Sequence, residues 1–96
     1  MMTNDRGQVR RRLGFYGRVQ GVGFRYQAVH VAESLDLTGW VKNEDDGHVE
    51  IEAQGRPEDI EQLVYRLQKI SRWIWIERVE SQPIPLEEER GFTVRW

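Results

Sequence analysis

The sequence predicts an α+β domain in which two helices cover one face of an antiparallel sheet. Three observations support this fold class: two segments with apolar residues at helical spacing, several segments in which apolar and polar residues alternate, and a strand-helix-strand order that occurs twice. Alternation suits a sheet with one face toward a core, and a helical stripe suits a helix lying on that face. The 96 residues of the chain are the size of a single domain.

The first half of the chain predicts a strand, a helix and a hairpin. Alternation from Leu13 to Val19 is typical of a strand. A helix is predicted from Phe24 to about Asp36, because its apolar residues recur at spacings of three and four. Two short strands follow, over residues 40–43 and 48–53, and the Asp-Gly pair between them favours a tight turn.

The second half of the chain predicts a helix and two more strands. Pro57 suits the first turn of a helix, and the apolar residues after it recur at helical spacing. Strands are predicted at about 73–81 and at 91–96, with Pro83 and Pro85 breaking the chain between them. The order β-α-β-β-α-β, followed by a terminal strand, is that of a ferredoxin-like split β-α-β sandwich.

The composition favours a cytoplasmic globular protein. Residues 1–8 are polar and are predicted to be disordered, which leaves residues 9–96 as one domain. No stretch approaches the roughly 18 apolar residues of a membrane span, so we expect no membrane contact. The absence of cysteine excludes a thiol nucleophile and thiolate metal ligands. The net charge of −2 argues against a nucleic-acid partner.

Several conspicuous residues are expected to be structural. The run Arg10-Arg11-Arg12 predicts a solvated start of a strand, because the acidic run Glu87-Glu88-Glu89, itself expected in a solvated loop, nearly offsets its charge. His30 and His48 are expected at the surface, and neither has a second ligand at metal spacing. Trp40 is expected to pack in the core.

The glycine-rich segment, Gly17-Arg18-Val19-Gln20-Gly21-Val22-Gly23-Phe24-Arg25, carries the strongest functional signal. It leads from the first strand into the first helix, and its three glycines allow a turn that exposes backbone N–H groups at the positive end of that helix. Such a turn suits a phosphate-sized anion. Arg25 would add a planar positive group at the same place. Taken alone, a glycine pattern equally fits a turn that binds nothing.

Asn43 is the candidate partner of this segment. It ends a strand just before the predicted hairpin turn, and a split β-α-β fold can bring that end close to the glycine-rich segment. A carboxamide can accept a hydrogen bond from water through its oxygen and donate one through its nitrogen, which makes it a positioning group and a poor base. The same residue also fits an Asx turn that caps the hairpin.

These segments resemble the acylphosphatase family. The glycine-rich segment is similar to the phosphate-loop signature of that family, and Gly39-Trp40-Val41-Lys42-Asn43 with Asp46-Gly47 and Val49-Glu50 is similar to its second signature. The resemblance implies hydrolysis of the carboxyl-phosphate bond of small acyl phosphates, without a metal or another cofactor. It implies that Arg25 holds the phosphoryl oxygens and that Asn43 orients the attacking water. The backbone N–H groups that would complete the site belong to Gln20, Gly21, Val22, Gly23, Phe24 and Arg25.

Two other functions remain open at this stage. One is a non-catalytic phosphate- or acyl-phosphate-binding module of the same fold, of the kind fused within larger maturation enzymes. The other is an RNA-binding sheet, which would need aromatic residues on its central strands and a basic face; residues 48–52 have neither.

The chain departs from the family pattern after the second helix, where residues 71–76 are bulky and aromatic. Trp73 and Trp75 are two residues apart, so in a strand they share one face. Core burial is the default expectation for them, while an exposed pair would mark a surface for self-association. We otherwise expect a monomer.

Overall fold

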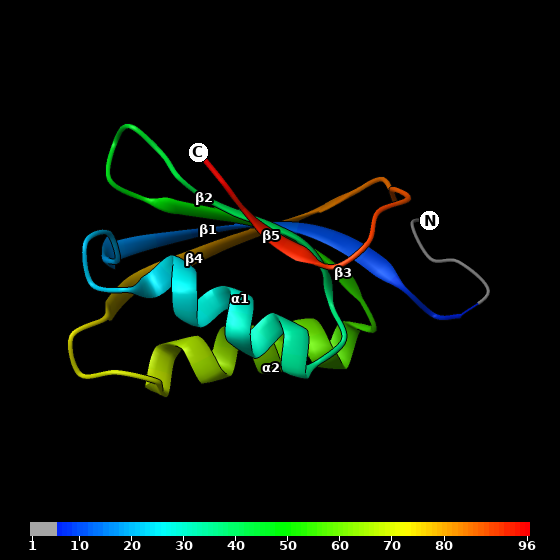
Figure 1. The fold of residues 1–96 in the computed structure, drawn as a ribbon, viewed down its shortest axis with the longest axis horizontal. Helices are drawn as coiled ribbons and strands as arrows, with labels where there is room; N and C mark the ends of the chain where they lie inside the picture. The colour runs from blue at the N-terminus through cyan, green and yellow to red at the C-terminus, as the bar shows by residue number, and fades with distance from the viewer. Residues whose placement is uncertain (1–5) are drawn as a thin grey trace.

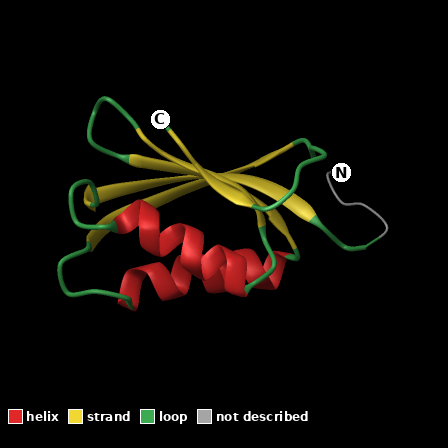
Figure 2. Ribbon diagram, viewed as in Figure 1, coloured by secondary structure: helices red, strands yellow, loops and turns green. Residues whose placement is uncertain are grey.

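The computed structural model describes residues 6–96, so residues 1–5 of the predicted disordered segment lie outside it. One sheet contains five strands in the order β4-β1-β3-β2-β5, and two helices cover one of its faces (Figure 1; Figure 2). This arrangement confirms the predicted α+β, ferredoxin-like fold. The elements are β1 Val9–Arg18, α1 Phe24–Ser34, β2 Thr38–Asn43, β3 Val49–Gly55, α2 Pro57–Lys69, β4 Trp75–Ile84 and β5 Phe92–Arg95. Within residues 6–96, neither helix is long and apolar enough to cross a membrane.

The sheet is mixed and not, as predicted, antiparallel throughout, because β5 pairs in parallel with β2 while all other pairs are antiparallel. The chain therefore crosses from one edge of the sheet to the other between β4 and β5. The prediction that Pro83 breaks the preceding strand is wrong, since Pro83 lies within β4 opposite Arg11. As β4 is an edge strand, one side of it has no partner strand, and a proline there need not remove a ladder hydrogen bond.

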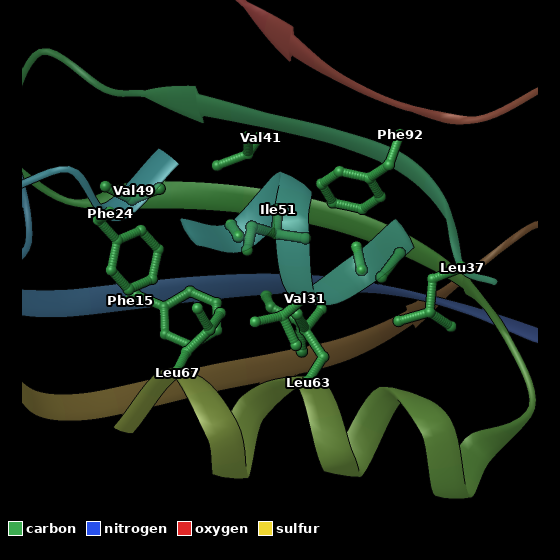
Figure 3. Packing of buried hydrophobic residues seen from close by; sticks show 14 of the residues in the cluster. Phe15, Phe24, Val31, Leu37, Val41, Val49, Ile51, Leu63, Leu67 and Phe92 are labelled. Carbon is green, nitrogen blue, oxygen red and sulfur yellow. The ribbon is translucent and has the colours of Figure 1, made fainter. Parts of the chain in front are cut away.

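The hydrophobic core lies between the sheet and the helices (Figure 3). The helical spacing predicted for the first helix places three of its residues in this core, namely Ala28, Val31 and Ala32. The rings of Phe15 in β1 and Phe24 in α1 lie together, with centroids 5.2 Å apart. Because Phe24 belongs to the glycine-rich segment, this contact fixes the beginning of α1 against the sheet.

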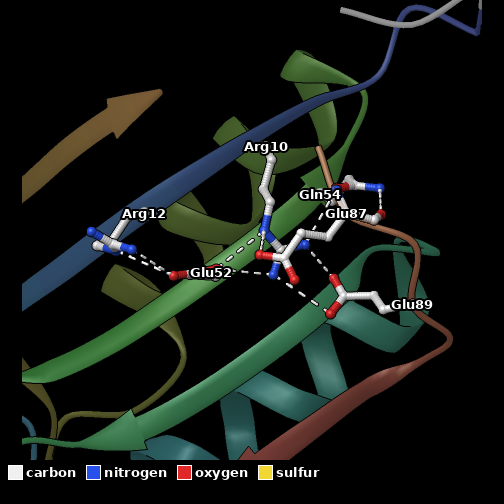
Figure 4. Close-up of polar contacts among 6 residues, drawn as sticks. All are labelled: Arg10, Arg12, Glu52, Gln54, Glu87 and Glu89. Carbon is white, nitrogen blue, oxygen red and sulfur yellow. Dashed lines mark hydrogen bonds and ion pairs between the residues drawn. The ribbon is translucent and has the colours of Figure 1, made fainter. Parts of the chain in front are cut away.

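The face of the sheet without helices is polar, and it buries Arg10 completely. Figure 4 shows its guanidinium among carboxylates: Nη2 lies 3.0 Å from Oε1 of Glu52, and Nη1 contacts Glu89. The prediction of a solvated arginine run is thus wrong for Arg10, because the loop after β4 covers it. Burial alone would lower the pKa of Arg10, but hydrogen bonds to Glu89 and Glu52 outweigh it and raise that pKa.

Trp40 is buried, although it does not belong to the core cluster between sheet and helices. Its neighbour Val41 points into that core, so Trp40 points to the opposite face of the sheet. There the guanidinium of Arg95 lies 4.5 Å from the centre of its ring. Trp40 is thus buried as expected, but on the polar face of the sheet, where a cation covers the indole.

Candidate active site

The glycine-rich segment makes its turn at two glycines in the left-handed region, Gly21 with φ 75° and Gly23 with φ 79°. Such angles favour glycine. Gly23 is the N-cap of α1; no side chain caps the helix, and its first turn has no acidic residue. The N–H of Gln27 donates to the carbonyl of Gly23 at 3.1 Å, so the preceding N–H groups have no helical acceptor. The positive end of α1 is therefore open to an anion.

Gly17 is required for a different reason. A Cβ atom at this position would lie 2.2 Å from the carbonyl oxygen of Trp75 in β4. The register of β1 and β4 shifts at the same place, between Tyr16 and Gly17. Gly17 thus allows β4 to approach the end of β1 closely, whereas Gly21 and Gly23 form the turn.

The side chain of Gln20 ties the glycine-rich segment to the β2–β3 hairpin. Its Nε2 donates to the carbonyl oxygens of Glu44 at 2.7 Å and of His48 at 3.0 Å. The sequence predicted only a backbone role for Gln20, because the two carbonyls come from a distant hairpin and leave no trace in local spacing. We therefore add the Gln20 side chain to the site as a positioning group.

Asn43 ends β2 on the same face as Val41, which is buried in the core. Its Oδ1 is buried and has no hydrogen-bond partner within residues 6–96. An Asx turn that caps the hairpin would use this atom, yet it is Asp46 whose Oδ1 accepts from the N–H of His48, at 3.0 Å. Buried polar atoms in proteins are nearly always paired, so the free Oδ1 of Asn43 points to a bound water or ligand.

Arg25 and Asn43 line one pocket of about 290 Å³. Gly21 and Gly23 line it as well, together with the apolar and aromatic residues Val19, Phe24, Tyr26, Val94 and Trp96. Among the residues that the structure describes, no carboxylate pairs with Arg25. Its guanidinium carbon instead lies 4.4 Å from the centre of the Trp96 ring. The N–H groups of Arg25 therefore remain free to bind an anion.

Other residues singled out in the sequence do not line this pocket. His30 is exposed, and His48 stacks on Tyr16 with centroids 4.6 Å apart. Trp73 and Trp75 are 62% and 59% exposed, so the default expectation of core burial is wrong, and self-association through them stays a prediction. Over residues 6–96, no three His, Asp or Glu side chains gather as ligands for a metal ion.

The fold and the pocket together define a small α+β domain with a pocket at the start of its first helix. The acylphosphatase family model matches residues 11–94, and the chain belongs to this family. An acylphosphatase from Bifidobacterium longum is 41% identical over 96 residues, which are 98% of this chain and 99% of that protein.

Solved structures are similar over nearly the whole chain. An acylphosphatase from Coxiella burnetii matches with a TM-score of 0.87 and 34% identity, covering 99% of this chain and 100% of that one. A structure described as full-length HypF in the phosphate- and nucleotide-bound form matches with a TM-score of 0.86 and 26% identity, covering 93% of this chain but 12% of that one. This fold thus occurs both as most of a chain and as a small part of a much longer one.

Proposed function

We propose that this protein hydrolyses the carboxyl-phosphate bond of acyl phosphates to a carboxylate and inorganic phosphate, without a metal. Membership of the acylphosphatase family supports the class of reaction. The observation that carries the mechanism is the buried, unpaired Oδ1 of Asn43 in the same pocket as Arg25. A binding group and a water-positioning group thus line one small cavity.

In the proposed mechanism Arg25 and the backbone N–H groups of residues 20–25 hold the phosphoryl oxygens. The guanidinium of Arg25 has no competing carboxylate among the described residues, and the end of α1 has no side-chain cap. Hydrogen bonds from charged and oriented donors strengthen as negative charge develops on the transferring group. This side of the pocket therefore binds the substrate and stabilises the transition state.

Asn43 orients the attacking water. Its Oδ1 accepts a hydrogen bond from that water, whose oxygen forms a bond to phosphorus in line with the bond that breaks. The electron pair of the broken phosphorus–oxygen bond leaves with the carboxylate. One proton of the water stays on the oxygen that is now bound to phosphorus, and the other passes to another oxygen of the product phosphate. Because a carboxylate is a stable leaving group, positioning and electrostatic stabilisation suffice without a strong base.

The test is release of phosphate from benzoyl phosphate in the presence of a chelator. We expect the wild type to turn over and Asn43→Ala to lower kcat by about 10²-fold, the loss typical of removing one oriented polar group. Inorganic phosphate should still inhibit Asn43→Ala, because Arg25 and the backbone remain. Gln62→Ala, which removes an exposed carboxamide on α2, serves as the matched control.

Two results would contradict the proposal. Folded wild type that binds phosphate but releases none from acyl phosphate would indicate the non-catalytic binding module. A kcat for Asn43→Ala close to that of the wild type would exclude the water-positioning role of Asn43.

A further inference from the structure

Two kinds of residue line the pocket. Arg25 and Asn43 are polar and lie with the glycines, whereas Tyr26, Val94 and Trp96 are apolar or aromatic. The mechanism above uses the polar residues and the glycines, and it leaves the apolar and aromatic residues without a role. A volume of about 290 Å³ lies at the lower end of small-molecule sites, roughly 300–1,000 Å³. A phosphoryl group and one small acyl group would therefore fill the pocket and contact both kinds of residue.

The apolar lining residues at the end of β5 continue the hydrophobic core. Phe92, Val94 and Trp96 alternate along β5 and its continuation, so they share the face of the sheet that the helices cover. Their exposure rises along the series: Phe92 is 4% exposed and lies in the core (Figure 3), Val94 is half-buried, and Trp96 is 88% exposed. This row extends apolar surface from the core to the mouth of the pocket.

Arg25 connects the polar and the aromatic residues of the pocket. Its guanidinium carbon lies 4.4 Å from the centre of the Trp96 ring, which keeps the indole beside the group that holds the phosphoryl oxygens. An acyl group joined to that phosphoryl group through a single oxygen begins close to the indole. Tyr26, the next residue along the chain, is 77% exposed and lines the same pocket. Covering two exposed aromatic rings removes apolar surface from water, which favours binding.

We propose that Trp96 and Tyr26 form a subsite for the acyl group that selects planar apolar acyl groups, such as benzoyl, over acetyl. This inference rests on the proposed function, because it concerns the same pocket. Aromatic rings that stack on one another gain free energy beyond the area they bury, and a full aromatic contact corresponds to a preference of about tenfold. Trp96 is then a specificity-determining residue and takes no part in the bond that breaks.

The kinetic test compares kcat/KM for benzoyl phosphate and acetyl phosphate. We expect Trp96→Ala to lower the ratio of the two values by about tenfold, chiefly through KM for benzoyl phosphate. Trp96→Phe should retain most of the preference, because it keeps an aromatic ring. Trp73→Ala, which removes a similarly exposed indole outside the pocket, is the matched control and should leave the ratio unchanged.

An equal loss for both substrates in Trp96→Ala would overturn the subsite, because Trp96 would then act only by holding Arg25 in place. The affinity for inorganic phosphate provides a second readout of that role. If Trp96→Ala weakened phosphate inhibition as much as benzoyl phosphate turnover, the proposal would again fail.

A binding experiment separates this inference from the proposed function. In 2-oxo-2-phenylethylphosphonate and 2-oxopropylphosphonate a CH₂ group replaces the bridging oxygen, so neither can lose its phosphoryl group by cleavage at that position. We expect calorimetry to show about tenfold tighter binding of the phenyl compound to the wild type, and no preference in Trp96→Ala. Equal affinities in the wild type would overturn the subsite even if the protein hydrolyses acyl phosphates. A clear preference without turnover would overturn the hydrolytic function and leave the subsite standing.

Discussion

Two arginines at opposite ends of β1 show how one residue type serves two purposes in this protein. Arg10, near the start of β1, is completely buried, and its guanidinium contacts Glu52 and Glu89 (Figure 4). Arg25 follows the other end of β1, in the first turn of α1, and pairs with no carboxylate among the described residues. The buried guanidinium of Arg10 is held among its carboxylates and has a structural role, whereas a guanidinium without such a partner is available to a ligand.

The difference follows from the cost of burying charge. A buried ion without a partner costs several kcal/mol, roughly, so Arg10 persists in the interior only with its carboxylates around it. Arg25 is half-buried beside the pocket, where water can solvate it until an anion binds. The same contrast holds for hydrogen-bond acceptors. Glu52 is paired with Arg10 and Arg12, whereas Oδ1 of Asn43 has no partner among the residues that the structure describes.

Removing Arg25 should give the largest functional effect. We expect Arg25→Gln to lower kcat/KM for acyl phosphates by about 10³-fold, at the upper end of the loss for one donor to a developing oxyanion. Phosphate inhibition should weaken as well. The melting temperature should stay close to that of the wild type, because Arg25 makes no ion pair within residues 6–96. Arg66→Gln, at an exposed position on α2, is the control, and a similar loss there would contradict the assignment.

Removing Arg10 should lower the stability of the fold and leave the activity unchanged, the opposite of removing Arg25. We expect Arg10→Ala to lower the free energy of unfolding by about 3–5 kcal/mol, because Glu52 and Glu89 lose their buried partner. Urea unfolding measures this loss. The kcat of the folded fraction should match that of the wild type. Arg11→Ala, whose side chain bonds Ser81 at an exposed site, should cost far less. If Arg10→Ala lost activity but not stability, the contrast between the two arginines would fail.

The same two residues show what could be predicted from the sequence. Local patterns predicted both helices, the hairpin and the glycine turn, since each depends on residues close together in the chain. They also predicted that Arg25 and Asn43 would meet, which the pocket shows. The burial of Arg10 depends on where the chain crosses between β4 and β5, and no local pattern encodes that crossing. Trp96 was missed for the same reason, because the parallel pairing of β5 with β2 brings it to the pocket.

Replacing Gln20 tests whether a hydrogen-bonded side chain next to the pocket positions the site. Gln20→Ala removes the hydrogen bonds to the carbonyls of Glu44 and His48. We expect kcat/KM to fall by about tenfold. Hydrogen bonds contribute about 0.5–1.5 kcal/mol each, and without them the glycine-rich segment would shift and misplace its backbone N–H groups. The melting temperature should decrease slightly. Gln68→Ala, an exposed carboxamide on α2, provides the comparison, and unchanged kcat/KM in Gln20→Ala would exclude the positioning role.

Replacing Asp46 should give the smallest effect, because Asp46 is an exposed charge in the turn between β2 and β3. It tests specifically whether the hairpin is stabilised by the charge of Asp46. The N–H of His48 donates to its carboxylate at 3.0 Å, and this bond, with a second from the His48 ring, lowers the pKa of Asp46 below its ordinary 3.8. A lowered pKa means that the carboxylate stabilises the folded state above about pH 4 and that this contribution is lost as the pH falls further. We therefore expect Asp46→Asn, which can still accept the backbone hydrogen bond, to melt slightly below the wild type at pH 7. The difference should be smaller than for Gln20→Ala, because exposed charges contribute little. It should shrink as the pH falls below this ordinary value and Asp46 becomes protonated. A melting difference that stays constant as the pH falls would show that the charge of Asp46 does not stabilise the hairpin that carries Asn43.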